Sequence, residues 1–392
     1  MKVLHIITGL NVGGAETMLA RLLEHRDQSP DILPEVISLI APGQVGGRIA
    51  LTGTPIHSLG MRGGVPSLAA AMRLVKLTQS IAPDLIIGWM HHGQIAATVA
   101  ATVSKAPMLW NVRHSLSGYD EEKPMTRALL RVGAWLSRKP AAIVYNSRIA
   151  SQQYTAFGYS ARRAMVIPNG FDSNGFAARA EGRSALRSRL RVPAGALVIG
   201  AIARNHPMKD VPNLLAAFAE LRRVRNDAHL LVVGDAMDRP SPAAERILAT
   251  LPPASWTLAD HRSDVSDWLA GLDILALPSA WGEGFPNIVG EAMACGVPCV
   301  GTDVGDTGWV IGSTGIVVPP RDAQALATAL IELAELGEDG RRALGRAAQG
   351  RVDRHFALPA VVRDYAALFR KHARPSWPAP AMRGAAAEAD VR

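Results

Sequence analysis

The chain has 392 residues, 48% of them hydrophobic, and a formal net charge of +8. This length exceeds what one hydrophobic core usually supports, so two domains of about 180 residues are expected, and the apolar content argues against general disorder. Positive charge suits nucleic acid, an anionic membrane or a phosphorylated substrate, but no zinc-finger spacing or RNA-binding aromatic motif occurs, so nucleic acid is not expected as a partner.

Short apolar runs alternate with helical patterns along most of the chain. The expected strands are Val3–Ile7, Glu35–Ile40, Leu85–Trp89, Met108–Val112, Ala142–Tyr145, Leu197–Ala203, Leu230–Val233, Asp273–Leu277 and Pro298–Gly301. The expected helices include Glu16–Arg26, Ser67–Ser80, Pro212–Arg223, Asn287–Cys295, Gln324–Leu336, Arg341–Phe356 and Pro359–Lys371. This alternation is typical of parallel sheets with helices on both faces. The predicted fold class is α/β, with two doubly wound, Rossmann-like parallel sheets facing across a cleft.

The positive charge is confined to the first half of the chain. Residues 1–165 hold 17 Lys and Arg against 9 Asp and Glu, whereas the remainder holds 25 of each. One segment there, 124–138, places three arginines on one helical face and four apolar residues on the other: Arg127, Arg131 and Arg138 against Met125, Leu129, Val132 and Leu136. The pattern fits a helix at a membrane surface, and it fits equally a helix docked on its own sheet.

The N-terminus is too short and too quickly interrupted for a signal sequence, and no apolar run approaches the ~20 residues needed to cross a bilayer. Cys295 and Cys299 have no further cysteine pair or histidine cluster nearby in the sequence, so reduced thiols are expected. A cytoplasmic protein is predicted, and peripheral contact with the inner face of a membrane is left open by the pattern of residues 124–138.

Two glutamates eight positions apart, Glu283 and Glu291, frame a turn and the start of a helix. Pro286 suits the beginning of that helix, whose free N–H groups favour an anion beyond the preceding strand. One carboxylate could meet the phosphorylated end of a ligand and the other a diol further along it. A capped surface helix with two solvated acids explains the spacing equally well.

Glycines follow the first strand and precede a helix at Gly13 and Gly14, where they would let the backbone approach a phosphate. The segment lacks the Gly-x-Gly-x-x-Gly fingerprint, and no phosphate-binding Gly-x-x-x-x-Gly-Lys-Ser/Thr occurs. An NAD-dependent oxidoreductase is therefore remote. The alternative for the glycines is a tight strand–helix turn.

Arg204 and Lys209 lie beyond the strand Leu197–Ala203. Their charges suit a diphosphate leaving group, on which negative charge grows as a glycosidic bond breaks. They could instead be solvated loop charges.

The two glutamates belong to a longer motif, in which Glu283-x7-Glu291 is followed by Ala292-Met-Ala-Cys-Gly296-Val-Pro298. Pro168-Asn169-Gly170-Phe-Asp172, the Arg204–Lys209 loop and Thr314-Gly315-Ile-Val-Val-Pro-Pro320 follow the same family pattern and occur in the expected order. Together these motifs resemble the retaining glycosyltransferases of family 4, which have the GT-B fold. The likeness extends from Gly13 to about Pro320.

The resemblance implies roles for individual residues. Glu291 would accept both ribose hydroxyls of a nucleotide-sugar donor, and Glu283 would lie near the transferred sugar. The remaining donor contacts would come from Gly13, Gly14, Arg204, Lys209, Gly284, Phe285, Asn287 and Ile288. His114 would hydrogen-bond the sugar or stabilise charge at the anomeric carbon, with His114, Glu283, Arg204 and Lys209 as the catalytic set.

Acceptor contacts are less specific. Arg113 would suit an acceptor phosphate, and of the neighbours His91 and His92 at most one is expected to be functional, with His92 as the candidate. The family often has Gly-Gly-x-x-Glu where this chain has Gly305-Asp306-Thr-Gly308. Asp306 is interpreted as a helix cap, which leaves the local donor contacts open.

The predicted function is transfer of a hexose-type sugar from a nucleotide-diphosphate sugar to a lipid-linked or polysaccharide acceptor, as in lipopolysaccharide assembly, with retention of configuration. No Asp-x-Asp is present to bridge a metal and the diphosphate, so neither a metal nor another cofactor is expected. The alternatives are a GT-B-like nucleotide-sugar epimerase and a catalytically silent nucleotide- or glycan-binding protein.

The predicted domain limits are 1–175 for the acceptor-side domain and 190–355 for the nucleotide-sugar domain. The boundary lies in Asn174–Ala194, where glycine, alanine and charged residues follow the Pro-Asn-Gly turn. The resemblance implies that residues 356–374 form a helix that crosses back onto the first domain. Residues 375–392 are rich in proline and alanine, which predicts a disordered tail.

Overall fold

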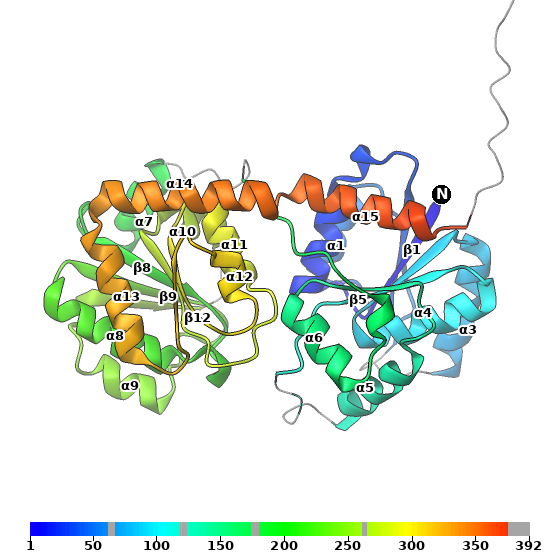
Figure 1. Cartoon of the computed structure of the whole chain (residues 1–392), viewed down its shortest axis with the longest axis horizontal. Helices are drawn as coiled ribbons and strands as arrows, with labels where there is room; N and C mark the ends of the chain where they lie inside the picture. The colour runs from blue at the N-terminus through cyan, green and yellow to red at the C-terminus, as the bar shows by residue number, and fades with distance from the viewer. Residues whose placement is uncertain (62–66, 118, 120–123, 174–179, 261–264, 375–392) are drawn as a thin grey trace, which may run out of the picture.

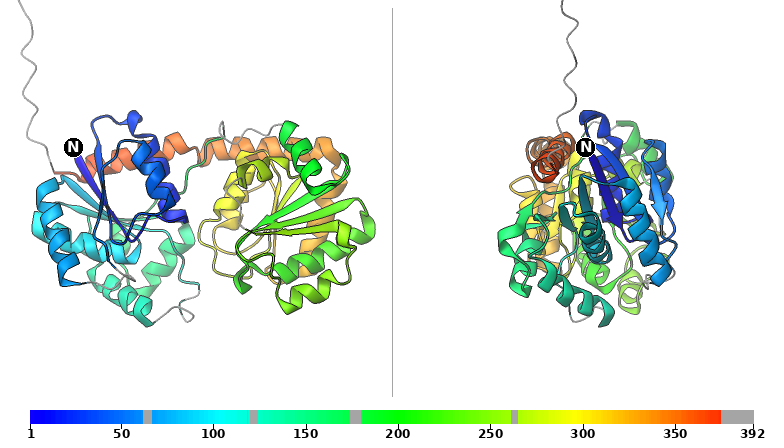
Figure 2. Two further views of the ribbon diagram at one scale, coloured as in Figure 1. Left: turned by 180° about the vertical axis from the view of Figure 1, so that it is seen from behind. Right: turned by 90° about the vertical axis from the view of Figure 1, so that its right-hand side faces the viewer.

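The computed structural model describes residues 1–61, 67–117, 119, 124–173, 180–260 and 265–374. It consists of two α/β domains, each built on one parallel sheet, joined along one side by the last two helices (Figures 1 and 2). The predicted fold class is confirmed. The domain limits given above stay predictions, and the segment 174–179 and the predicted tail 375–392 lie outside the described residues.

The first domain holds a seven-stranded sheet with the order β3-β2-β1-β4-β5-β6-β7. Its strands are β1 (Lys2–Ile7), β2 (Leu33–Ser38), β3 (Ile56–Ser58), β4 (Leu85–Trp89), β5 (Met108–Val112), β6 (Ala142–Tyr145) and β7 (Ala164–Val166), and all neighbours pair in parallel. Its helices are α1 (Gly14–Glu24), α2 (Gln44–Leu51), α3 (Leu68–Ile81), α4 (Met90–Ser104), α5 (Pro124–Leu136) and α6 (Arg148–Phe157), with short 3-10 turns at Arg26–Gln28 and Ala161–Arg163.

The second domain holds a six-stranded sheet with the order β10-β9-β8-β11-β12-β13. Its strands are β8 (Leu197–Ile202), β9 (Ala228–Val233), β10 (Trp256–Ala259), β11 (Ile274–Leu277), β12 (Cys299–Thr302) and β13 (Ile316–Val318), also parallel throughout. Its helices are α7 (Ala180–Leu190), α8 (Val211–Val224), α9 (Pro242–Leu248), α10 (Val265–Gly271), α11 (Asn287–Ala294), α12 (Thr307–Ile311) and α13 (Ala323–Glu335), with 3-10 turns η4 (Pro207–Lys209) and η5 (Pro253–Ser255).

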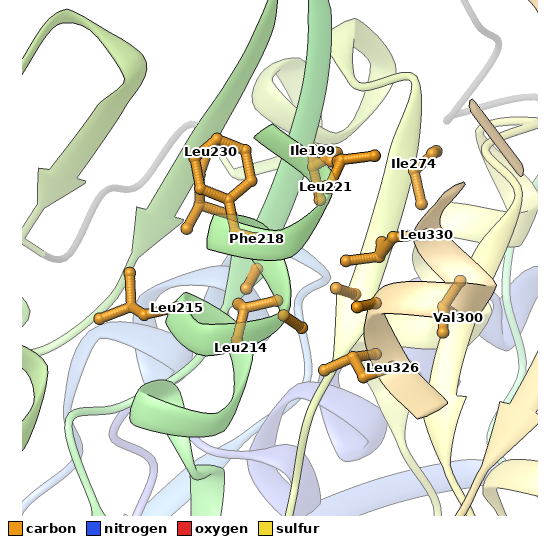
Figure 3. Packing of buried hydrophobic residues seen from close by; sticks show 14 of the residues in the cluster. Ile199, Leu214, Leu215, Phe218, Leu221, Leu230, Ile274, Val300, Leu326 and Leu330 are labelled. Carbon is orange, nitrogen blue, oxygen red and sulfur yellow. The ribbon is translucent and has the colours of Figure 1, made fainter. Parts of the chain in front are cut away.

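Each sheet is buried on both faces, which explains why its central strands are continuous apolar runs. In the second domain, residues from α8, α9 and α13 pack on one face, where Phe218 of α8 and Leu326 of α13 lie in one cluster with Leu230 of β9 (Figure 3). Residues from α7, α10, α11, α12 and α14 (Gly337–His355) cover the other face. Among the described residues, neither of these two apolar clusters of the second domain includes a residue from the sheet of the first domain.

The last helix, α15 (Leu358–His372), packs on the first sheet although α14 packs on the second. Leu358, Val361, Tyr365 and Phe369 are buried in the same cluster as α1 and β1. At the crossing, the N–H of Phe171 donates to the carbonyl of Phe356 at 2.8 Å, and the N–H of Leu358 donates back to Phe171 at 2.9 Å. The two segments that pass between the domains are therefore hydrogen-bonded to each other.

Four edge strands were not expected from the sequence: β3, β7, β10 and β13. Each has only three or four residues, and nearly all of these are only partly buried. A strand this short at a sheet edge has no continuous apolar run to mark it.

Two of the four residues on the expected apolar face of α5 are exposed. Leu130, Gly133 and Leu136 are the buried residues, whereas Met125 is 69% and Val132 is 46% exposed. The helix therefore packs against the rest of its domain through Leu130, Gly133 and Leu136 and leaves the apolar side chains of Met125 and Val132 on its outer side. Across the described ranges, no helix combines the length and apolar character needed to cross a membrane.

Both sheets have a topological switch point, where strands on either side connect in opposite directions: β1 between β2 and β4, and β8 between β9 and β11. Open parallel sheets bind ligands beyond the carboxyl ends of their strands at such points. The loops after β1, β4, β5, β8 and β11 carry the candidate residues of the sequence, so the fold brings these loops to the binding edges.

Candidate functional site

The loop after β11 buries Glu283, which is 8% exposed. Its Oε1 accepts hydrogen bonds from Ser279 Oγ at 2.5 Å and from Lys209 Nζ. Lys209 ends η4 in the loop after β8, so this ion pair joins two neighbouring loops at the carboxyl edge of the second sheet. Two charges that have lost much of their hydration are thereby matched to each other.

The segment after β12 holds the Glu283 loop in place. Gly305 has a φ of +61°, and a Cβ there would collide with the carbonyl of Glu283. The N–H of Asp306 donates to the carbonyl of Gly284 at 2.9 Å. Only glycine fits at position 305, both for its backbone conformation and for its closeness to the loop.

Helix α11 begins at Asn287, where a chain of polar contacts links the two domains. Asn169 Nδ2 donates to Asn287 Oδ1, and Asn169 Oδ1 accepts from Arg113 Nη2. Arg113 also donates to the Tyr365 hydroxyl of α15 at 3.3 Å, and burial lowers the pKa of its guanidinium. A Cβ on Gly14 would lie 3.3 Å from Asn287 Nδ2, so the glycine loop after β1 ends against the same helix start.

Glu291 lies further along α11 and contacts the first domain. Arg21 Nη2, from α1, donates to Glu291 Oε1 at 2.8 Å, and Arg21 Nη1 donates to the carbonyl of Gly170 at 3.3 Å. The two side chains of the ion pair are 16% and 20% exposed. The carboxylate expected to bind a diol is therefore shared with a cation of the opposite domain.

Asp306 provides a further link between the domains. Its Oδ2 accepts from the N–H of Arg148 at 2.7 Å and its Oδ1 from the N–H of Ile149 at 3.1 Å. Burial raises the pKa of Asp306, while these backbone hydrogen bonds act in the opposite direction. Its interpretation as a helix cap is confirmed, but the capped helix is α6, in the other domain.

Two members of the predicted catalytic set, Arg204 and His114, are exposed. In the described part of the chain Arg204 forms no ion pair, and the ring of His114 lies 6.4 Å from that of His91. Ser115 Oγ donates to the carbonyl of Gly282 at 3.1 Å. This contact brings the loop that carries His114 against the loop that carries Glu283.

The two histidines after β4 differ in environment. His91 is buried against Tyr154, with its Nε2 3.3 Å from the hydroxyl, and burial lowers its pKa to about 4. His92 is half-buried, and burial lowers its pKa as well. His91 therefore has a packing role, and a functional role for His92 stays a prediction.

Among the remaining predicted donor contacts, Phe285 is buried, with its ring 6.1 Å from that of Phe171 and 5.8 Å from that of Trp309. Ile288 is partly buried against the same cluster. Their side chains belong to the core, so a contact with a ligand would come from their backbone.

Arg21 and Ser115, whose side chains make contacts across the domain junction, were not among the predicted site residues. Arg21 has no distinguishing signal, because a basic residue in the last turn of an amphipathic helix is usually a surface charge. Ser115 directly follows His114 in the sequence, so it lies in a loop that already carried a predicted site residue, and this position could have indicated it. Within the described ranges, no group of three or more His, Cys, Asp or Glu side chains is arranged to hold a metal ion.

Comparison with known families identifies the two halves of the chain. Residues 12–174 match the family model described as Glycosyltransferase Family 4, and residues 196–335 match the one described as Glycosyl transferases group 1. Together the two models span well over half of the chain. The chain belongs to glycosyltransferase family 4.

Curated relatives of this family 4 protein include D-inositol 3-phosphate glycosyltransferases. That of Segniliparus rotundus is 28% identical over 76% of this chain and 67% of its own length, and that of Xylanimonas cellulosilytica is 32% identical over 56% and 55%. The MMP alpha-(1->4)-mannosyltransferase of Mycolicibacterium hassiacum is 29% identical over 64% of this chain and 65% of its own. The chain thus spans between half and about two thirds of these relatives.

Solved structures show the same fold. The Anabaena protein Alr3699/HepE in complex with UDP superposes with a TM-score of 0.78 over 95% of this chain and 100% of its own, at 23% identity. The same protein with UDP-glucose gives 0.77 at 21% identity. These likenesses establish the GT-B architecture of this family 4 protein.

Proposed function

We propose that this family 4 protein transfers a hexose-type sugar from a nucleotide-diphosphate donor to an acceptor hydroxyl, with retention of configuration. The observation that carries the proposal is the grouping of Lys209, Glu283 and Glu291 at one edge of the second sheet, against the first domain. Family membership and the names of the curated relatives support it, as do UDP and UDP-glucose in the complexes of Alr3699/HepE.

In this proposal the diphosphate is bound by cations and backbone N–H groups of the protein. Lys209 and Arg204 follow β8, and the N–H groups at the start of α11 point beyond β11. Donors of this kind stabilise the charge that develops on the departing diphosphate. We therefore propose transfer without a metal ion.

Glu291 would bind the ribose diol, because a carboxylate can accept two hydroxyl hydrogen bonds at once. In this structure Arg21 donates a hydrogen bond to Oε1 of Glu291. A bound nucleotide must therefore either share the Glu291 carboxylate with Arg21 or displace Arg21 from it. Glu283 and His114 would face the sugar from opposite domains. The leaving diphosphate would deprotonate the acceptor on the same face of the sugar, which gives retention.

The first test is nucleotide binding and turnover in Glu291→Gln and Lys209→Ala. Losing one or two hydrogen bonds to a charged group should weaken binding of the matching UDP, GDP or ADP by about tenfold to a hundredfold. The matched control is Glu332→Gln, which changes an exposed acid on α13. Calorimetry measures binding and chromatography measures sugar transfer.

Unchanged binding and transfer in both variants would show that the site is wrongly assigned. Incubation of each donor without acceptor is the control for the epimerase alternative, because an isomerised sugar would then form. Nucleotide binding without transfer to any lipid-linked or polysaccharide acceptor would favour a silent binding protein.

We also propose that α5 contacts an anionic membrane that carries the acceptor. Its outer side presents Met125, Val132 and Trp135, exposed by 69%, 46% and 76%, beside the exposed cations Arg131, Arg138 and Lys139. An apolar stripe with basic neighbours is the composition of a helix that lies in a bilayer interface. The surplus positive charge of the first half of the chain adds long-range attraction to anionic lipid.

Sedimentation with phosphatidylglycerol-containing vesicles tests this contact. The double variant Val132→Ser with Trp135→Ser should lose most binding, and phosphatidylcholine vesicles should bind the wild type weakly. Val224→Ser, which changes an apolar residue of α8 that is 61% exposed, is the matched control. Equal sedimentation of all three proteins would refute the contact.

A further inference from the structure

The second domain contains a hollow of about 300 Å³ far from Glu283 in the fold. It is lined by Asp273, just before β11, and by Pro298, just before β12. These residues lie at the amino ends of parallel strands, whereas Glu283 follows the carboxyl end of β11. The hollow is therefore on the opposite edge of the sheet from the proposed donor site.

One face of α14 forms a wall of the hollow. Residues at helical spacing along this face line it: Glu338, Arg341, Arg342, Arg346 and Gln349. The helix can approach because position 345 is glycine, where a Cβ would collide with the carbonyl of Gly296 in the turn after α11. The wall is thus a packed part of the fold.

Cations outnumber anions in the lining. Four arginines line the hollow, Arg183, Arg341, Arg342 and Arg346, against the carboxylates Asp273 and Glu338. Asp273 is buried and already accepts from Arg187 at 2.5 Å and from Arg183 at 2.7 Å. Glu338 is shared by Arg183 at 2.8 Å and Arg342 at 2.5 Å.

Two of the arginines retain free hydrogen-bonding capacity within the described residues. Arg341 is 8% exposed; its Nη1 donates to the carbonyls of Leu333 and Ala334, but its Nε has no partner. Arg346 is exposed and forms no ion pair there. Neither the Arg341 nor the Arg346 guanidinium is paired with a carboxylate in these ranges, so the lining keeps a surplus of positive charge that a bound anion would offset.

We propose that this hollow binds a small phosphate-bearing anion that carries at least two negative charges, and that it is a site distinct from the proposed donor site. Guanidinium groups match the oxygens of a phosphate by paired, charge-assisted hydrogen bonds. The volume is that of a small-molecule site at the lower end of the usual range. Such a ligand would also neutralise the excess of arginine over carboxylate.

Calorimetric titration of the full-length protein with inorganic pyrophosphate tests the proposal. Arg342→Gln and Arg346→Gln should each weaken binding by about tenfold, the value for one lost charge-assisted hydrogen bond. Arg354→Gln, which changes an exposed arginine in the last turn of the same helix, should leave binding unchanged. Arg346→Gln breaks no ion pair within the described residues, and melting curves check that each variant is folded.

Pyrophosphate can also enter the proposed donor site, so the titration is repeated with Lys209→Ala. Binding that persists in Lys209→Ala and weakens in the two α14 variants supports the second site, whatever the fate of the proposed sugar transfer. Binding that vanishes in Lys209→Ala and is unaffected by Arg342→Gln and Arg346→Gln overturns it. Absence of any pyrophosphate binding overturns it as well.

Discussion

A single buried histidine sets part of the acid stability of the first domain. His5 is 1% exposed in the centre of β1, and its Nδ1 accepts a hydrogen bond from Trp89 Nε1 at 3.2 Å. A protonated Nδ1 could not accept that bond, and burial lowers the pKa of His5 to about 3. The ring is therefore neutral in the folded protein.

We predict that His5→Gln flattens the dependence of stability on pH. With a pKa of 6.5 when unfolded and about 3 when folded, His5 binds a proton only in the unfolded chain across that window. The free energy of unfolding is therefore unaffected by this group above its unfolded pKa and falls as the pH falls below it. Between about pH 7 and about pH 5 the loss is about 2 kcal/mol.

Urea unfolding at both pH values measures this loss. The wild type should lose about 2 kcal/mol more than His5→Gln between them, while His355→Gln, which changes an exposed histidine at the end of α14, should follow the wild type. Equal pH dependence in all three proteins would contradict the buried, neutral state of His5. Burial lowers the pKa of His91 to about 4, so part of the dependence should remain.

At the scale of elements, close packing of α14 depends on glycine. A Cβ at position 345 would collide with the carbonyl oxygen of Gly296, whereas nothing lies within 4 Å of a Cβ at Gly47 in α2. The same substitution should therefore have opposite effects at the two positions. Both glycines lie inside helices, so the difference in helix propensity is common to both.

We predict that Gly345→Ala destabilises the second domain by about 1 to 3 kcal/mol, because a backbone oxygen cannot move aside as a flexible side chain can. Gly47→Ala should be neutral or should stabilise by up to about 1 kcal/mol. Thermal unfolding compares the two. A higher melting temperature for Gly345→Ala than for the wild type would be inconsistent with this packing.

The elements themselves were largely predictable, because central parallel strands such as β4 and β11 are buried on both faces and carry continuous apolar runs. The edge strands were not, since three half-buried residues such as Ile56–Ser58 carry no periodic signal. The orientation of α5 was also not fixed by sequence. Its small residue Gly133 is buried, whereas the large apolar side chains of Val132 and Trp135 are exposed, so the apolar pattern alone could not show which side of the helix faces the sheet.

At the scale of the whole molecule, the motif residues Glu283, Lys209 and Glu291 could be placed by their position after strands, but their partners could not. Arg21 and Glu291 are 270 positions apart in the sequence, and Arg148 and Asp306 are 158 apart. Such pairs depend on how the two domains meet. Neither helix periodicity nor a motif within one domain contains that information.

These polar contacts hold the two domains together. Arg21 to Glu291, Ser115 to Gly282 and the capping of α6 by Asp306 all cross the junction. The Arg148 guanidinium also lies 3.9 Å from the centre of the Trp309 ring. Because these are mostly hydrogen bonds and ion pairs rather than a shared apolar core, the junction should open more readily than either domain unfolds.

We predict that Asp306→Ala widens the average separation of the domains. The substitution leaves two N–H groups at the start of α6 without their carboxylate and removes a charge that favours the helix dipole. Small-angle scattering should show a larger radius of gyration for Asp306→Ala than for the wild type, with a near-unchanged melting temperature for each domain.

Added salt should also increase the radius of gyration of the wild type, because it screens the Arg21–Glu291 pair. Arg223→Ala, which removes an exposed ion pair within α8, is the matched control and should scatter like the wild type. A radius of gyration that is the same for Asp306→Ala and Arg223→Ala would mean that the junction is held by other contacts, such as the passage of α14 into α15.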